Sequence, residues 1–128
     1  MLVQVSFEFI TLLVLIILSF TFVFYFSLDY FQELNKRKIF YAAQNIADDI
    51  AKEIDVAVKV GSGYSRVFYI EEKILGYIDY EIIYLPYTVK IKWDNNYIES
   101  KTLAKEIVGK VENGKNFIRN IGGQIYVN

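Results

Sequence analysis

The hydrophobic pattern divides the chain into a long helical part and a β-rich part. Residues 9–28 hold 20 positions without Asp, Glu, Lys or Arg, about the length that a helix needs to cross a bilayer. Over residues 39–58, apolar residues then recur every three or four positions, which is typical of one face of a helix: Ile39, Ala43, Ile46, Ile50, Ile54 and Val58. Neither Gly nor Pro occurs from residue 4 to residue 60. We therefore expect one helix over 4–60, with a transmembrane or assembly segment at 9–28.

The remainder, residues 61–128, is predicted to form a small antiparallel β domain. Gly61-Ser62-Gly63 supplies the glycines that commonly end a helix. Period-two alternation and turn residues predict strands at 66–70, 77–84, 87–93, 97–103 and 107–112, and a last hairpin that pairs 117–118 with 124–127. Tight turns between successive strands favour an antiparallel meander. The expected fold class is α+β, with the second half of the helix covering the sheet and Trp93 in the core.

Composition narrows the chemistry. The chain has a net charge of −1 and contains neither Cys nor His, so it lacks a nucleic-acid footprint, thiolate and imidazole chemistry, and the common zinc ligands. Asp48 and Asp49 are neighbours on a helix and point about 100° apart, so we interpret them as a solvated face. We expect no enzymatic activity, no cofactor, no metal and no small-molecule substrate.

Glu8 is the only charged residue among the first 28. An ionisable group at the edge of hydrocarbon is costly unless it has a partner, and it commonly marks a functional site. The alternative interpretation is a solvated carboxylate that interacts favourably with the positive end of the helix dipole. A secretory signal peptide does not fit, because no Lys or Arg precedes Lys36 and no small-residue cleavage site follows the apolar run.

Two groups of residues resemble archaeal type IV pilin-like proteins. Gln4-x-Ser6-x-Glu8-Phe9, followed by an unbroken apolar helix, is similar to the class III signal peptide of that family. The C-terminal half resembles the short-sheet domain of those pilins in Gly63-Tyr64-Ser65, Glu72-Lys73-Ile74-x-Gly76-Tyr77, Val89-x-Ile91-x-Trp93 and Ile118-Arg119-Asn120-x-Gly122-Gly123-x-Ile125. The resemblance spans nearly the whole chain.

The resemblance implies a precursor with a short leader, residues 1–3, that a prepilin peptidase cuts between Val3 and Gln4. The mature helix would join copies of itself and related pilins in an extracellular surface filament of the kind used in cell adhesion, after a single-pass stage in the cell membrane. Glu8 would act in assembly, with the new N-terminal amine of a neighbouring subunit as its partner. The chain departs from the family at Leu2 and Val3, where a basic and a small residue usually stand.

One alternative remains open at this point. Lys36, Arg37 and Lys38 follow the apolar run closely while nothing basic precedes it, and the positive-inside rule then places the β domain in the cytoplasm. The chain would be an uncleaved single-pass membrane protein whose small β domain binds a partner. An upstream basic leader would remove both this conflict and the departure at Leu2 and Val3. Whether the filament subunit is major or minor is also left open.

Overall fold

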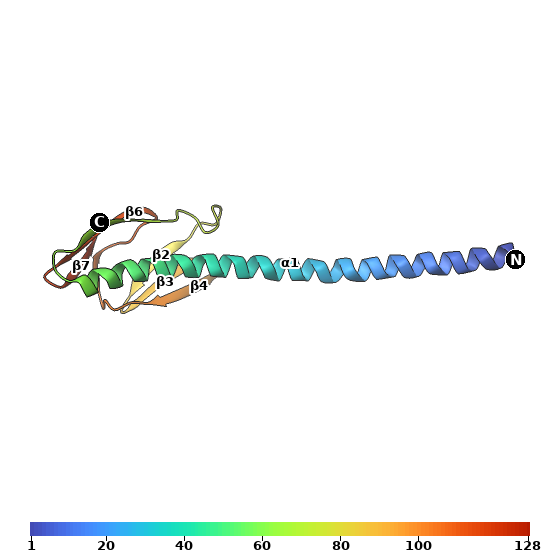
Figure 1. The fold of residues 1–128 in the computed structure, drawn as a ribbon, viewed down its shortest axis with the longest axis horizontal. Coiled ribbons are helices and arrows are strands. Elements are labelled where there is room, and N and C mark those ends of the chain that lie inside the picture. Colours follow the sequence, from blue (N-terminus) through green and yellow to red (C-terminus); the bar gives the residue numbers. More distant parts are fainter. The chain divides into compact units, whose positions relative to one another are not determined.

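The computed structural model describes residues 1–128, apart from the side chain of Leu2. Within the described chain, one helix, α1 (Leu2–Val60), precedes seven strands (Figure 1): β1 (Ser65–Ile70), β2 (Glu81–Leu85), β3 (Thr88–Trp93), β4 (Asn96–Lys101), β5 (Ile107–Gly109), β6 (Gly114–Ile121) and β7 (Gln124–Val127). The chain divides into two compact units, Met1–Arg37 and Lys38–Asn128. The first unit contains only the N-terminal part of α1, and the second contains the rest of α1 and all the strands.

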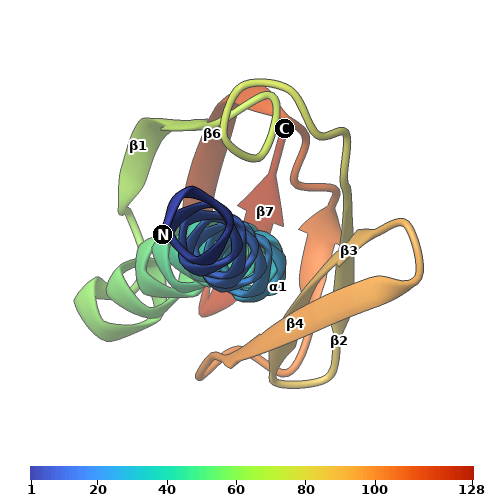
Figure 2. The ribbon, with the colours of Figure 1, turned by 90° about the vertical axis from the view of Figure 1, so that its right-hand side faces the viewer.

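The core of the second unit forms where the apolar stripe of α1 meets the strands. Along the stripe, Ala43, Ile46, Ile50 and Ile54 are buried, and Ile39 and Val58 pack against the same core. Figure 2 shows the strands arranged around this part of the helix. Trp93 is also buried, and its ring packs edge-on against Phe40 with centroids 5.1 Å apart. The expected long helix packed on a small β domain, and the core position of Trp93, are confirmed.

The prediction of a single antiparallel meander is wrong, because the strands form two sheets. Strands β2, β3 and β4 make a three-stranded antiparallel sheet, as local hairpins predict. The other sheet has the order β1-β6-β7-β5, and β5 runs parallel to β7. Pairing of β1 with β6 joins segments far apart in the sequence. Alternation reports which face of a strand is buried, but it carries no information on such distant partners.

Only the second half of the strand expected at 77–84 belongs to β2, and the first half, residues 77–80, is a loop. Leu75 and Gly76 both adopt positive φ values, 54° and 80°, in a tight turn closed by an isolated bridge between Ile74 and Ile78. Tyr80 is buried, and its hydroxyl donates to the carbonyl of Glu71. Residues 78 and 80 point inward from this loop, which produces the period-two pattern without a strand.

Two further strands have other boundaries than predicted, and glycines with positive φ lie at the ends concerned. The strand expected over 107–112 ends at Gly109, where φ is 96° and a Cβ atom would lie 1.9 Å from the carbonyl oxygen of Val127. Glycine therefore permits the close approach of β5 to β7. The short 117–118 segment is the middle of the longer β6, and its hairpin with β7 turns through Gly122 and Gly123, both at positive φ. That last hairpin is confirmed.

Candidate membrane and assembly segment

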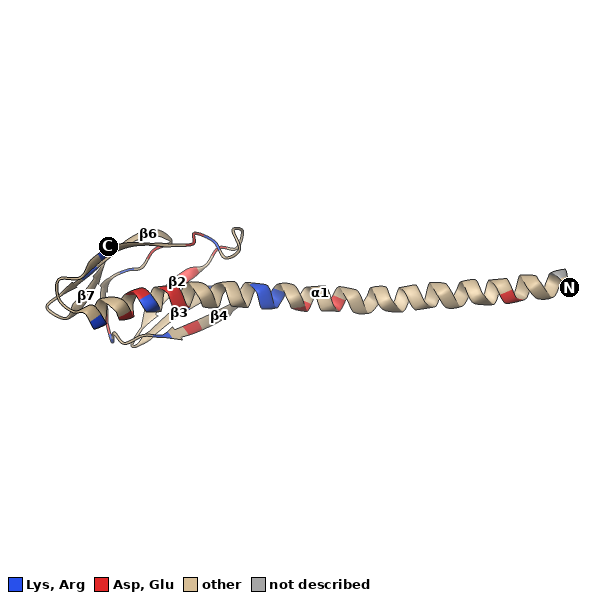
Figure 3. Cartoon of the chain, in the orientation of Figure 1, with Lys and Arg blue, Asp and Glu red and all other residues tan. Residues whose placement is uncertain are grey.

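The first unit exposes an apolar surface on all sides of the helix. Between residues 9 and 28 every side chain is exposed except Ser27, which is half-buried. Figure 3 shows a long stretch of α1 without Lys, Arg, Asp or Glu, and in the sequence this stretch lies between Glu8 and Asp29. By length and composition, the apolar window of this helix is sufficient to cross a membrane, and none of it is buried in the protein. A surface of this size is unfavourable in water, so the segment is compatible with insertion into lipid.

The hydroxyl groups of this segment are bonded within the helix. Thr11, Ser19, Thr21 and Ser27 each donate to the carbonyl four residues earlier, at 2.8 Å. A hydroxyl in hydrocarbon without a partner costs several kcal/mol, and this back-bonding to the preceding turn removes the need for a water partner. The polar residues of the run therefore do not prevent its contact with lipid tails or with other apolar helices.

Glu8 lies six residues after Leu2, the first residue of the helix, and its side chain is exposed. Within the described chain, no hydrogen bond or ion pair engages it. Val3 and Gln4 are also exposed and helical, and the amide of Val5 donates to the carbonyl of Met1. The three residues singled out in the sequence thus lie on one stretch of exposed helix.

Aromatic residues gather at the other end of the apolar run, a feature that the sequence reasoning missed. Phe22 and Tyr25 pack against Phe26, and Tyr30 packs against Phe31. Tyrosine is enriched where a membrane meets water, because its ring is apolar and its hydroxyl is polar. The signal was present as tyrosines confined to one end of the run. An ion pair between Glu33 and Arg37, with 2.6 Å between Oε1 and Nη2, follows in the next turns.

In the second unit, two acidic residues of α1, Asp48 and Asp55, accept hydrogen bonds from β4 and from the segment that follows it. Asp48 accepts a hydrogen bond of 2.7 Å from the hydroxyl of Ser100. Asp55 accepts from the hydroxyl of Thr102 at 2.6 Å and from the amide of Leu103 at 2.7 Å. Asp48 thus holds the helix to β4, and Asp55 holds it to the segment between β4 and β5. Among the residues that the structure describes, no group of three or more acidic side chains is placed to hold a metal ion.

Two tyrosines beside this core are held in their neutral form. Burial, with a smaller contribution from the charge of Glu71, raises the pKa of Tyr80 to about 12. Burial also raises the pKa of Tyr84. A hydrogen bond with Thr102 partly opposes this rise, and the charge of Asp55 adds to it. Both hydroxyls donate to main-chain carbonyls, those of Glu71 and Ala104. They act as structural links and not as acids at neutral pH.

Comparisons with protein-family models, with curated proteins and with solved structures found no match to this chain. Arguments about function therefore depend on the segment itself.

Proposed function

We propose that this chain is a structural subunit, major or minor, of a type IV pilus-like surface filament, assembled through its N-terminal helix after a prepilin peptidase cuts before Gln4. The observation that carries the proposal is Glu8, the sole charge on the first 28 residues, at the head of a helix that is otherwise apolar and exposed. The subunit would pass through a membrane-inserted stage before it enters the filament.

Burial energetics support copies of the same helix as the final environment. Each fully buried Val, Leu, Ile or Phe side chain contributes about 1.5–3 kcal/mol relative to exposure, and here nearly all of residues 9–28 remain exposed. Lipid tails pack against these apolar side chains but provide no hydrogen-bond donor or positive charge for the carboxylate of Glu8. A bundle of identical helices meets both requirements, because it buries the apolar side chains and supplies a partner for the carboxylate.

The partner we propose for Glu8 is the α-amine that cleavage creates on Gln4 of a neighbouring subunit. An α-amine has an ordinary pKa of about 7.7–8.0, so it is mostly protonated at neutral pH. A buried carboxylate without a partner costs several kcal/mol, and pairing recovers much of that cost. Since the pair forms only at one axial offset between helices, it sets the register of subunits more than it adds stability.

The first experiment compares charge-neutralised variants in surface filaments. Glu8→Gln keeps the size of the side chain and removes its charge, while Asp29→Asn makes the same change beyond the apolar run. We expect filaments sheared from cells to contain the Asp29→Asn chain at the wild-type amount and to lose the Glu8→Gln chain at least about tenfold, the effect of roughly 1.4 kcal/mol per subunit contact. Equal incorporation of both variants would contradict the assembly role of Glu8.

A second candidate function follows from the basic residues. Lys36, Arg37 and Lys38 lie just beyond the apolar run, and such residues favour the cytoplasmic side of a membrane. On that orientation the chain is an uncleaved single-pass protein whose β domain binds a partner inside the cell. Protease added to intact cells separates the two functions: the β domain is digested if it lies outside and protected if it lies inside.

A further inference from the structure

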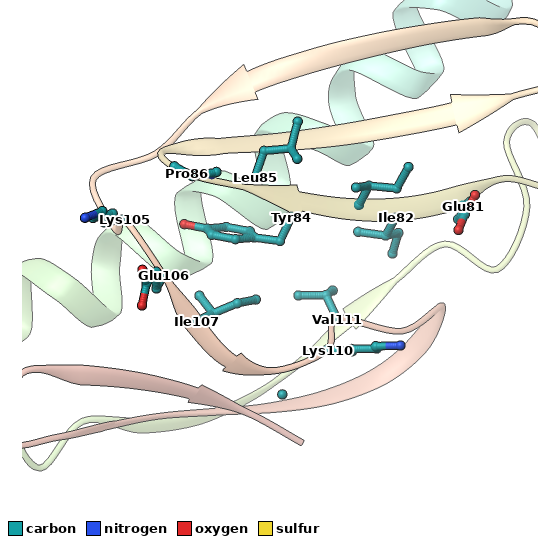
Figure 4. A pocket seen from close by; sticks show the side chains of 12 residues that line it. Glu81, Ile82, Tyr84, Leu85, Pro86, Lys105, Glu106, Ile107, Lys110 and Val111 are labelled. Carbon is teal, nitrogen blue, oxygen red and sulfur yellow. The ribbon is translucent and has the colours of Figure 1, made fainter.

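A cleft separates the free edges of the two sheets. The three-stranded sheet ends at β2 and the four-stranded sheet ends at β5, and residues of these two strands and their flanks line a cleft of about 480 Å³ (Figure 4). This volume lies within the ~300–1,000 Å³ typical of ligand clefts. Ile82 and Tyr84 from the β2 side lie opposite Ile107 and Val111, which form an apolar floor, and charged residues stand at the ends: Glu81, Lys105, Glu106 and Lys110.

The edge of β2 presents main-chain groups to this cleft. The β2–β3 hairpin turns through Pro86 and Tyr87, so Leu85 faces Thr88 in a hydrogen-bonded pair and every second residue of β2 bonds to β3. The intervening residues, Ile82 and Tyr84, direct their N–H and C=O groups away from β3. Within the described chain, neither residue has another main-chain hydrogen-bond partner.

Strand β2 carries only one of the features that usually protect a sheet edge, the charge of Glu81 at its first position. Natural edges carry charged side chains, Pro or coverage by another element, because unpaired strands template pairing with other chains. The other edge of the same sheet, β4, carries Glu99 and Lys101, and the edge strand β1 carries Arg66. By contrast, β2 runs Ile82-Ile83-Tyr84-Leu85 without a charge after Glu81.

Strands β2 and β5 belong to different sheets and are not hydrogen-bonded to one another, so each keeps a free edge beside the cleft. A strand added to a sheet lies about 4.8 Å from its neighbour. We propose that this cleft binds an extended peptide segment of another protein as an added strand, antiparallel to β2 and flanked by β5.

The attachment of β2 to β3 argues against a second copy of this chain as the occupant and favours a single extended segment. If β2 of another copy entered the cleft, its attached β3 would occupy the place of β5. Asn128, which follows β7, is held away from the cleft's occupant, since its amide donates to the carbonyl of Phe117 and its side-chain amide donates to the carbonyl of Lys110 and the side-chain oxygen of Asn116. The segment that fits has apolar side chains at every second position, facing the floor, and polar ones between. This inference does not depend on filament assembly.

Amide hydrogen exchange by NMR tests the proposal on the full chain in detergent micelles. The probe is the peptide acetyl-Lys-Val-Thr-Val-Thr-Val-Lys-amide, added up to about 1 mM, the limit of weak binding. We expect the amides of Ile82 and Tyr84 to exchange at least about tenfold more slowly with the peptide, while Ile83, already bonded to β3, and Glu99 on the far edge stay unchanged. Unchanged exchange at Ile82 and Tyr84 would overturn the proposal.

N-methylated peptides test whether both edges take part. Methyl groups on alternate amides block one edge of the peptide, so two complementary sets block either edge in turn. Insertion between β2 and β5 requires both sets to weaken binding, each by at least about fivefold, the typical net effect of one lost hydrogen bond. Weakening by only one set would show pairing with a single edge and would contradict insertion.

A pair of proline variants tests the site on the protein. Ile82→Pro removes one N–H that faces the cleft, and Glu99→Pro makes the matched change on the outer edge of β4; edge strands tolerate proline where the N–H faces outward. We expect only Ile82→Pro to weaken binding of the peptide, with the fluorescence of the buried Trp93 reporting that each variant is folded. Equal binding by a folded Ile82→Pro chain would overturn the proposal. If that variant does not fold, the methylated peptides decide the question on the wild-type chain.

Discussion

The side-chain amide of Asn120 donates a hydrogen bond of 2.8 Å to the main-chain carbonyl of Ala57, 63 residues earlier in the chain. Ala57 lies in the last turn of α1, and its carbonyl also accepts a hydrogen bond of 3.2 Å from the amide of Gly61, just past the end of the helix. The side-chain oxygen of Asn120 accepts from the amide of Gly123 at 2.9 Å. One buried side chain thus joins the end of the helix to the β6–β7 hairpin.

Asn120→Ala should destabilise the β domain. The change removes both hydrogen bonds of a buried side chain, to the carbonyl of Ala57 and from the amide of Gly123, each worth about 0.5–1.5 kcal/mol. Urea denaturation followed by the fluorescence of Trp93 measures the free energy of unfolding. Asn113→Ala, which removes an exposed hydrogen bond to the carbonyl of Glu72, is the control and should cost less than about 0.5 kcal/mol. Equal losses in the two variants would contradict the bridging role.

Gly109→Ala should be among the most destabilising single changes in the chain. The added Cβ would meet the carbonyl oxygen of Val127 at 1.9 Å, at a φ of 96°. Gly63→Ala is a matched control, because Gly63 has a φ of 95° and nothing within 4 Å of the added atom. The control carries only the strain of the left-handed backbone, about 1–2 kcal/mol. The same urea experiment should show a larger loss in the free energy of unfolding for Gly109→Ala than for Gly63→Ala. Similar losses in the two variants would contradict the close approach of Gly109 to Val127.

The stability of the β domain should fall at alkaline pH because of Tyr80. Its pKa is raised to about 12 in the folded protein, against an ordinary value of about 10. The neutral form is therefore favoured by folding: this contribution is complete below pH ~10 and is lost as pH rises through about 12. Tyr84, whose pKa is also raised, acts in the same direction.

The measurement is the midpoint of urea unfolding from pH 8 to pH 12. Tyr80→Phe removes the titrating hydroxyl, so its unfolding midpoint should fall less steeply above pH ~10 than that of the wild type. Tyr69→Phe, at an exposed residue of β1, serves as the control and should follow the wild-type curve. A Tyr80→Phe curve that parallels the wild type would show that another group causes the alkaline loss.

Asp55→Ala should loosen the connection between β4 and β5. The carboxylate accepts from both Thr102 and the amide of Leu103, and removing an acceptor shared by two donors costs about 1.5–3 kcal/mol for a charged partner. Hydrogen exchange should become faster at Leu103. Asp49→Ala, on an exposed face of the same helix, should leave that amide unchanged. Protection of Leu103 that survives Asp55→Ala would show that another group holds this connection.

The parts of the fold that the sequence predicts are those set by local pattern. The helix and its buried stripe follow from intervals of three and four residues, and the β2–β3–β4 hairpins follow from alternation around Pro86 and Asp94. The pairing of β1 with β6 and the parallel pairing of β5 with β7 do not, because they depend on distant segments. The cleft could not be predicted from local pattern either, because its two sides come from different sheets.

The candidate assembly segment was largely predictable. A single Glu8 before an uncharged run is visible in the sequence alone, whereas the back-bonded hydroxyls of Thr11 and Ser19 become evident only from helix geometry. The capping role of Asn120 and the anchoring role of Asp55 required the tertiary structure, because each joins residues more than 40 positions apart, 63 and 47 respectively.

Intact mass spectrometry of the chain in purified surface filaments tests the central claim most directly. Cleavage before Gln4 creates the amine that we propose as the partner of Glu8, so the two claims stand together. We predict a chain in the filament fraction that begins at Gln4. A chain found only in the membrane fraction, with Met1–Val3 still attached, would contradict the account.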